Sequence, residues 1–312
     1  MDSARKLFES LNLPYGDRHD LPASEKRFPD GAHYRVEIPS VEGPAVMSAV
    51  LEEAKQRGVR VHRISQGSGM MLLTEDEIRS IARIGYEHRV EVSLFIGPRA
   101  GWDGTAQPLT PDGKIIAWRH VGMDQVVYGF LDLLRGIELG IRGALTADEG
   151  IIYLVREGRK AGLIAADFVL KGSALLGVAN PIGIKMLQDA GLDTINVASS
   201  ITIAQLAALR QVIDIPIDLY IEAPDGLGGF TRYPELAEIV RVAAPIYLKF
   251  GLRNAPGIYP SGLHLEAAAI AQGRERVRRA AIGMEHLMRQ GGDQFIMSEV
   301  GVDDLAIPQI AD

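Results

Sequence analysis

The amino-acid sequence contains no cysteine among its 312 residues. Disulfides, thiolate nucleophiles, and zinc or iron–sulfur clusters bound through cysteine are therefore excluded. The sequence also lacks any stretch near the ~20 consecutive apolar residues of a transmembrane helix, and its N-terminus lacks the basic and apolar regions of a signal peptide. We therefore expect a soluble, cytoplasmic protein that has no membrane partner.

Positive charge and the common catalytic motifs are scarce as well. The net charge is −7, and the one basic run, at residues 274–279, includes a glutamate and is interpreted as a solvated helix face. Both features argue against a nucleic-acid partner. No GxSxG, HExxH, HxH, GxGxxG or GxxxxGKS/T pattern occurs, so the sequence gives no sign of a serine-hydrolase elbow, a histidine zinc centre or a nucleotide site.

Strand-like and helix-like segments, by contrast, alternate along the whole chain. Eight apolar runs with strand character cover residues 33–39, 59–66, 90–97, 141–147, 165–172, 193–200, 215–222 and 245–251. The expected helices, with apolar residues three and four apart, cover residues 43–57, 75–88, 122–139, 150–161, 181–190, 201–213, 234–243 and 263–289. Thr74 with Glu77 is a predicted capping box. Eight such units predict an α/β fold of the (β/α)8 TIM-barrel type.

The remaining segments define the expected domain organisation. Residues 32–290 form the barrel, residues 1–31 an N-terminal extension, and residues 291–312 a C-terminal tail. The tail is partly apolar, so it either covers the barrel or crosses to another subunit of a homo-oligomer. The long connection at residues 98–121 is rich in Gly, Pro and Asp. Loops of this kind after barrel strands are usually functional, and we predict that this one is a lid.

Charged residues recur at every second position of several expected strands. The residues that share a parity are Arg35 and Glu37, Asp167 and Lys171, Asp218 with Tyr220 and Glu222, and Tyr247 and Lys249. Because successive side chains of a strand point to opposite faces, we predict that the charged ends of these strands face one cavity. The catalytic candidates are Glu222, Glu37, Lys171 and Lys249. The alternative is that such charges form ion pairs that fill the barrel core.

Three chemistries fit these residue types, and the sequence leaves all three open. A desolvated Lys171 or Lys249 could act as a base or as a Schiff-base nucleophile. Glu37 and Glu222 could hold a divalent metal ion or act as acid and base. Glu222 is the leading candidate because it ends the seventh strand and precedes a glycine-containing loop.

The third chemistry is the binding of a substrate carboxylate or phosphate, for which arginine is well suited. The candidates for substrate binding are residues near strand ends or at the start of the following helices: Arg99, Arg253, Gln66, Ser199, His120 and Asn180. Asn180 also precedes Pro181, a combination typical of a helix N-cap. These positions meet at the C-terminal mouth of a barrel, where barrel enzymes have their active sites.

Two segments resemble the peptidase U32 family, the collagenase-like proteins. GIRGALTADEGIIYLVRE (140–157) resembles a strand, acidic residue, glycine and helix in that order, with Asp148 and Gly150 at the matching positions. The segment at 168–209 resembles the strand, asparagine-initiated helix and serine-containing strand end that follow. The resemblance, which extends over about residues 136–262, implies a barrel and a peptidase or hydrolase activity. Cysteine-rich members with iron–sulfur clusters are excluded as a model because this chain has no cysteine.

These observations lead to one expected function and two alternatives. We expect a barrel hydrolase that acts on a small polar or anionic molecule, or on a peptide, at the barrel mouth. The first alternative is a lyase that uses a lysine Schiff base or a metal ion, and the second is a barrel that binds a ligand without catalysis. A divalent metal ion is the cofactor that the acidic residues could hold, and no iron–sulfur cluster is expected.

Overall fold

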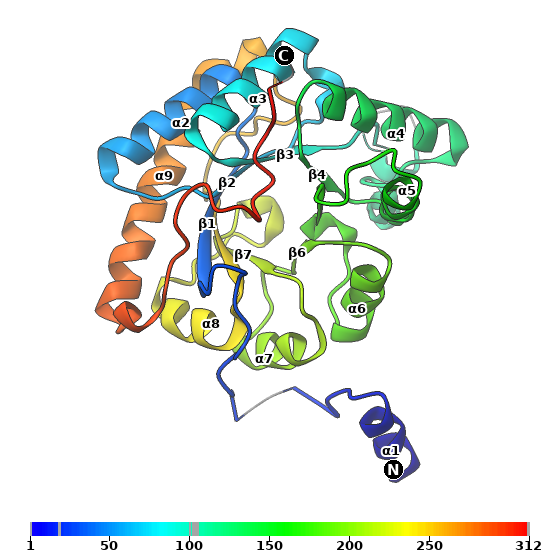
Figure 1. The fold of residues 1–312 in the computed structure, drawn as a ribbon, viewed down its shortest axis with the longest axis vertical. Coiled ribbons are helices and arrows are strands. Elements are labelled where there is room, and N and C mark those ends of the chain that lie inside the picture. The colour runs from blue at the N-terminus through cyan, green and yellow to red at the C-terminus, as the bar shows by residue number, and fades with distance from the viewer. Residues whose placement is uncertain (1, 18–19, 100, 102–105, 311–312) are drawn as a thin grey trace.

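The computed structural model describes residues 2–17, 20–99, 101 and 106–310 and shows a closed parallel barrel (Figure 1). Its strands are β1 (Tyr34–Pro39), β2 (Arg63–Gln66), β3 (Glu91–Phe95), β4 (Gly143–Thr146), β5 (Val169–Gly172), β6 (Thr194–Asn196), β7 (Ile217–Glu222) and β8 (Ile246–Phe250). Each strand pairs in parallel with the next, and β8 pairs with β1. The predicted (β/α)8 barrel is therefore confirmed.

A ring of helices surrounds the strands. The helices are α2 (Pro44–Arg57), α3 (Glu75–His88), α4 (Gly122–Glu138), α5 (Glu149–Lys160), α6 (Pro181–Asp189), α7 (Ile203–Val212), α8 (Leu236–Ala243) and α9 (Glu266–Arg289). Thr74 forms the predicted capping box with Glu77, and the Asn180 side chain caps α6. Among the described residues, no helix combines the length and the apolar character that a membrane span requires.

Side-chain direction in the strands explains why the lumen can be polar. Strand residues such as Val36, Ile64 and Leu248 are fully buried in the apolar layer that the helices cover. Their neighbours in sequence point to the opposite face. Because the apolar side chains pack against the helix ring, the charged side chains of Glu37, Lys171 and Lys249 face the lumen. Asp167 does not join them, because it lies in an exposed turn before β5.

The C-terminal tail covers the N-terminal end of its own barrel, as Figure 1 shows. Met297 bridges to Tyr34 of β1, and Arg35 donates a hydrogen bond to the Ser298 hydroxyl at 2.8 Å. Arg35 also forms an ion pair with Asp304 at 2.7 Å. The partly apolar tail thus packs against its own barrel, which is the first of the two expected arrangements. A homo-oligomer stays a prediction.

His62, which precedes β2, links the tail to the strands. Its Nδ1 accepts a hydrogen bond from the Val36 N–H at 3.0 Å, so Nε2 carries the proton and donates to the Ser298 carbonyl at 2.8 Å. The ring is fully buried. Burial, together with the neighbouring Arg35, lowers the pKa of His62 to about 4. The neutral ring is therefore the form that the fold requires.

The segment that precedes β1 closes the same end of the barrel. The Phe28 ring packs edge-on against Tyr247, with 5.3 Å between the ring centroids, and lies 3.9 Å from the Arg35 guanidinium carbon. Ser24 donates hydrogen bonds to the carbonyls of Arg241 and Ala244. The helix α1 (Asp2–Ser10) lies outside the helix ring (Figure 1). The extension is therefore partly a plug for the barrel.

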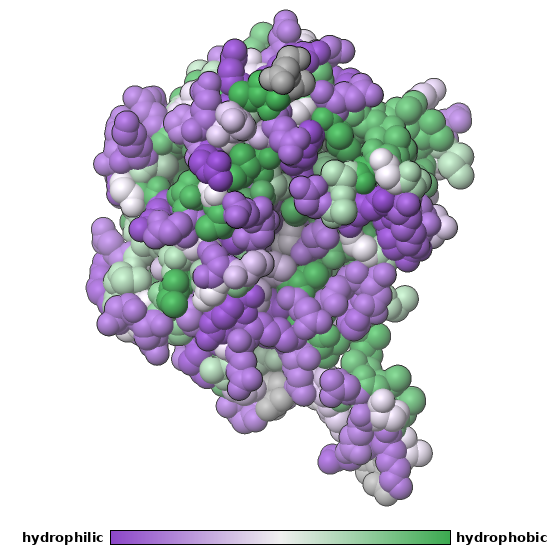
Figure 2. Space-filling model, in the orientation of Figure 1, coloured by the Kyte–Doolittle hydropathy of each residue, from purple (hydrophilic) through white to green (hydrophobic). Residues whose placement is uncertain are grey.

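The surface seen in Figure 2 is mixed, with hydrophilic side chains around the covered barrel end. An apolar area lies over α4, where Met123, Tyr128 and Leu131 are exposed. The helix α4 therefore has apolar side chains on its exposed side as well as on its buried side.

Candidate active site

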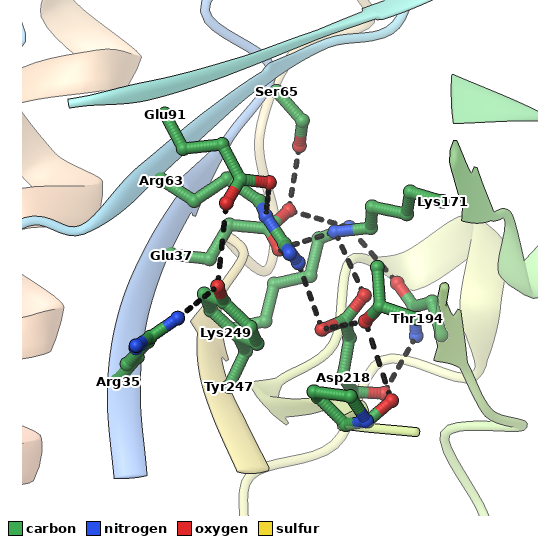
Figure 3. Close-up of polar contacts among 12 residues, drawn as sticks. Arg35, Glu37, Arg63, Ser65, Glu91, Lys171, Thr194, Asp218, Tyr247 and Lys249 are labelled. Carbon is green, nitrogen blue, oxygen red and sulfur yellow. Dashed lines mark hydrogen bonds and ion pairs between the residues drawn. The ribbon is translucent and has the colours of Figure 1, made fainter. Parts of the chain in front are cut away.

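A network of charged side chains fills the barrel lumen (Figure 3). Arg63 of β2 lies at its centre, and its Nε donates to the Glu91 carboxylate of β3. Its Nη1 donates to Asp218 of β7 at 2.9 Å and to Glu37 of β1 at 3.4 Å. The guanidinium also stacks on Tyr247, 3.6 Å from the ring centroid. One arginine thereby connects β2 with four other strands, β1, β3, β7 and β8.

Lys171 of β5 joins the same network from the opposite wall. Its ammonium contacts the Glu37 carboxylate and lies 3.1 Å from Oδ2 of Asp218. All three side chains are fully buried. Burial and the nearby cations lower the pKa of Lys171. Burial alone would raise the pKa of Glu37, but Lys171, Lys249 and Arg63 hold it far below its ordinary value.

The charges of this network balance. Its cations are Arg63, Lys171 and Lys249, and its carboxylates are Glu37, Glu91 and Asp218. Glu37, Lys171 and Lys249 lie in the lumen as predicted, whereas a catalytic role for them stays a prediction. Buried charges are tolerated when they are paired and hydrogen-bonded. The fully buried Glu37 and Lys171 therefore fit the ion-pair alternative, in which charges fill the barrel core.

Lys249 of β8 lies on the side of the network that faces the C-terminal mouth of the barrel. Its Nζ donates to Oδ1 of Asn196 at 2.8 Å and lies 3.1 Å from Oε1 of Glu37. It also lies 4.6 Å from the centroid of the Tyr220 ring. Lys249, Asn196 and Tyr220 all line a cavity above the network. Lys249 thus differs from Lys171 because its side chain reaches a space that a ligand could enter.

This cavity of about 400 Å³ lies at the C-terminal ends of the strands. Its apolar wall includes Phe95, Trp118, Leu145, Leu252 and Ile258. The cationic side chains that line it are Lys249, Arg99 and Arg276. A mostly apolar pocket with a few charged groups is typical of a small-molecule site. The acidic residue Asp225 also lines the cavity, but the three cations outnumber it, and the net charge favours an anion.

Arg99 is held in the wall by the loop that follows β3. Its guanidinium stacks on Phe95, 3.6 Å from the ring centroid, and on Trp118 at 5.5 Å, and it donates to the Gly67 carbonyl. Trp118 belongs to the 98–121 loop, in which η2 (Gln107–Leu109) and η3 (Asp112–Ile116) are short 3-10 helices. Residues 100 and 102–105 of the predicted lid lie outside the described residues. Lid motion stays a prediction.

Arg276 of α9 is a cavity residue that the sequence interpretation missed. It was included in a run expected to be a solvated helix face, yet it is only 5% exposed. Its Nη2 donates to Gln272 at 3.0 Å and its Nη1 lies 3.5 Å from the Ser40 carbonyl. The signal was its spacing from buried Ala269, Gly273 and Ala280, which places it on the inner stripe of the helix.

Glu222, the leading catalytic candidate, points elsewhere. Its carboxylate accepts hydrogen bonds from the Tyr233 hydroxyl at 2.8 Å and from the Arg253 N–H at 3.0 Å. It also lies 3.7 Å from Arg279 of α9. The prediction that Glu222 shares a cavity with Glu37 is therefore wrong. The cause is an irregularity in the β7–β8 pairing between Tyr220 and Glu222, which changes the direction of the last side chain.

The separation of Glu37 and Glu222 also bears on the metal hypothesis. Glu37 is surrounded by cations, and Glu222 accepts hydrogen bonds on the helix side of β7. Among the residues that the structure describes, no group of three or more histidine, aspartate or glutamate side chains is placed to hold a metal ion. The residues present therefore do not fit a divalent ion bound by this pair.

Of the other predicted binding residues, Gln66 lines the cavity. Its amide bonds both the N–H and the carbonyl of Gly69, so it braces the loop after β2. Arg253 is half exposed and lies 3.5 Å from Asp225. Ser199 is buried in the turn after β6 and does not line the cavity. Neither Arg253 nor Ser199 thus joins the candidate site.

His120 and Asn180 take part in local hydrogen bonds near the starts of two helices. The His120 N–H donates to Oδ2 of Asp148 at 2.9 Å, and its ring Nδ1 lies 3.3 Å from the same oxygen. Oδ1 of Asp148 caps α5 by accepting from Gly150 and Ile151. Asn180 caps α6 and lines a separate groove. Two residues singled out by the U32 resemblance, Asp148 and Gly150, therefore form a helix cap.

The chain was compared with known families, curated proteins and solved structures. No protein-family model matches the sequence, and no curated protein matches it. One similar solved structure is a U32 peptidase, with 15% identity and a TM-score of 0.42 over 64% of this chain and 73% of that one. Another is 3-deoxy-D-arabino-heptulosonate 7-phosphate synthase from Thermotoga maritima, with 13% identity and a TM-score of 0.43 over 90% and 96%. Likenesses of this level say nothing about activity.

Proposed function

We propose that the protein is a barrel enzyme that acts on a small carbonyl compound, with Lys249 as the amine that attacks it. The observation that carries the proposal is that Lys249 lines the mouth cavity, while Lys171 is sealed in the ion-pair network below. Asn196 and Glu37 hold the amine in place, and Tyr220 flanks it. The lyase alternative is therefore favoured over the hydrolase.

The chemistry follows from the amine. Lys249 first releases a proton and attacks the carbonyl carbon as the free amine, and the resulting carbinolamine takes up a proton and loses water to give a protonated imine. The imine withdraws electrons from the adjacent carbon, so that a carbon–carbon or carbon–nitrogen bond next to it can break. The cationic lining contributed by Arg99 and Arg276 favours a substrate that also carries a negative charge.

A hydrolase is the second candidate, and one contact favours it. The Ser65 hydroxyl lines the cavity and donates to Oε1 of Glu37 at 2.6 Å. A serine nucleophile needs a base that can accept its proton. Glu37 is a poor base because three cations hold its pKa far below the ordinary range. Ser65 is therefore hydrogen-bonded but weakly activated.

Borohydride trapping tests the proposal directly. The protein is incubated with pyruvate or phenylpyruvate as 2-oxo acid probes, reduced with sodium borohydride, and mapped by peptide mass spectrometry. We expect a stable adduct on Lys249 and none in Lys249→Met. Lys185→Met, which changes a partly exposed lysine of α6 outside the cavity, is the matched control and should trap like the wild type. Probe binding without any adduct would favour the non-catalytic barrel, and an adduct spread over surface lysines would reject the proposal.

A further inference from the structure

Arg276 is a buried cation whose hydrogen-bonding capacity is only partly used. Its Nη2 and Nη1 contact Gln272 and the Ser40 carbonyl, both uncharged. Its Nε has no hydrogen-bond partner among the described residues. The Glu42 carboxylate interacts with the guanidinium electrostatically, but that carboxylate accepts its hydrogen bonds from Gly67 and Ser68. Burying a guanidinium that no carboxylate contacts directly is unfavourable. A side chain kept in this state at a cavity wall has the properties of a receptor for an anion.

The surroundings of Arg276 keep it in place. Gln272, one helical turn earlier on α9, accepts from Arg276 and donates through Nε2 to the Pro256 carbonyl at 2.9 Å. Pro256 and Tyr259 belong to the loop after β8 and line the same cavity. The guanidinium is therefore fixed between α9 and this loop before any ligand arrives, which lowers the entropic cost of binding.

We propose that Arg276 binds the carboxylate group of an organic acid whose apolar part lies against the cavity wall. The inference rests on the proposed function only in taking the mouth cavity as the substrate site. It does not require imine formation at Lys249.

A carboxylate fits this subsite better than a phosphate. Arg276 is a single cation there, and the Glu42 carboxylate lies near enough to interact with it electrostatically. Glu42 itself accepts from the N–H groups of Gly67 and Ser68 at 2.8 and 2.9 Å. A singly charged ligand group balances one guanidinium, and Glu42 repels it less strongly than it would repel a phosphate dianion. The apolar wall that includes Leu252 and Ile258 suits a hydrocarbon part.

Calorimetric titration with 3-phenylpropanoate tests the inference, because this acid has no ketone or aldehyde and cannot form an imine. We expect it to bind the wild type, and Arg276→Gln to weaken binding by about 10- to 100-fold, the usual scale for a hydrogen bond to a charged group. Arg278→Gln, on the exposed side of the same helix, is the matched control and should bind like the wild type.

Thermal unfolding of the ligand-free variants separates binding from a structural role. Removal of an unpaired buried cation should leave the melting temperature of Arg276→Gln unchanged or raised. If Arg276→Gln does not fold, Arg276→Lys keeps the charge but lacks the Nε donor and should still weaken binding. A lowered melting temperature with wild-type affinity, no binding of the acid to the wild type, or tighter binding of inorganic phosphate would each overturn the inference. A failure of borohydride trapping alone would reject only the proposed function.

Discussion

The two ends of the barrel use the same kinds of side chain in different ways. At the N-terminal end, Arg35 donates to Ser298 and Tyr247 and pairs with Asp304, and Phe28 and the tail cover it. At the C-terminal end, the cationic side chains of Lys249 and Arg276 line an open cavity. One end is therefore closed by the chain itself, and the other is open to a ligand.

This difference teaches how to separate structural from functional charge in a barrel. Parity alone puts Glu37, Lys171 and Lys249 in the lumen, but it cannot tell which of them a ligand can reach. The closed network satisfies Lys171 with two carboxylates. Lys249 shares Glu37 with that network and still lines the cavity. A charged lumen residue is therefore a functional candidate when its side chain also lines an open cavity.

The largest expected effect comes from removing the amine at the open end. Lys249→Met should reduce turnover of a trapped substrate by at least about 10³-fold, because loss of a nucleophile cannot be compensated by its neighbours. The measurement is steady-state turnover. Lys185→Met, which removes a lysine of α6 outside the cavity, is the control. Near-normal turnover in Lys249→Met would mean that the open end does not use this amine.

A change in the closed network should instead affect stability. Glu91→Gln keeps the shape of the side chain but removes the charge that Arg63 contacts. Breaking a buried ion pair usually costs about 3–5 kcal/mol in the free energy of unfolding, which urea denaturation can measure. Binding of 3-phenylpropanoate should not change. The exposed Glu75→Gln, on α3, should lower stability by less than about 0.5 kcal/mol. Equal effects of the two variants would refute a stabilising network.

The closed end should also make stability depend on pH. The pKa of His62 is about 4 in the folded protein and about 6.5 when unfolded, so the unfolded chain binds more protons between these values. Stability from this residue is therefore full above about pH 6.5 and falls by about 3 kcal/mol as the pH drops to about 4. Urea titrations of wild type and His62→Gln check this. The variant should lose that part of the pH dependence, and an unchanged slope would contradict the assignment.

The smallest effect is expected for a charged residue near the open end that faces away from the cavity. Glu222→Gln keeps an oxygen for Tyr233 or Arg253 but weakens both hydrogen bonds. We expect a loss of about 1–2 kcal/mol in stability and turnover within about 3-fold of the wild type. Thermal unfolding and turnover are measured side by side. A fall in turnover of about 10²-fold at unchanged stability would restore Glu222 as a general base.

Much of the fold could be predicted from the sequence because its periodic signals are local. Apolar runs and three-to-four spacing identified the eight units, and Thr74 with Glu77 and Asn180 with Pro181 marked two helix starts. The capping chemistry of Asn180 was right, but the same residue was wrongly placed near the candidate site. A cap is a property of its own helix and contains no information about distant residues.

The site was less predictable because it depends on single-residue register and on long-range contacts. At Glu222, the irregular pairing of β7 with β8 overrides the parity that Asp218 and Tyr220 share. Nothing in the local sequence specifies such an irregularity, since it depends on the partner strand. Arg276 was hidden by its charged neighbours, although the buried stripe of α9 contained the information. Assigning each residue of the basic run to a face of the helix would have placed Arg276 on the buried side.

The tail that crosses the barrel end has a consequence for how the chain folds. Arg35 and Ser298 are bonded across 263 residues of sequence, and β1 also pairs with β8. Contacts of such high sequence separation slow folding because the chain must close a very long loop before they form. Until then, β1 and β8 have unpaired edges that can associate with other chains. Refolding of the protein should therefore compete with aggregation, and its yield should fall as the protein concentration rises.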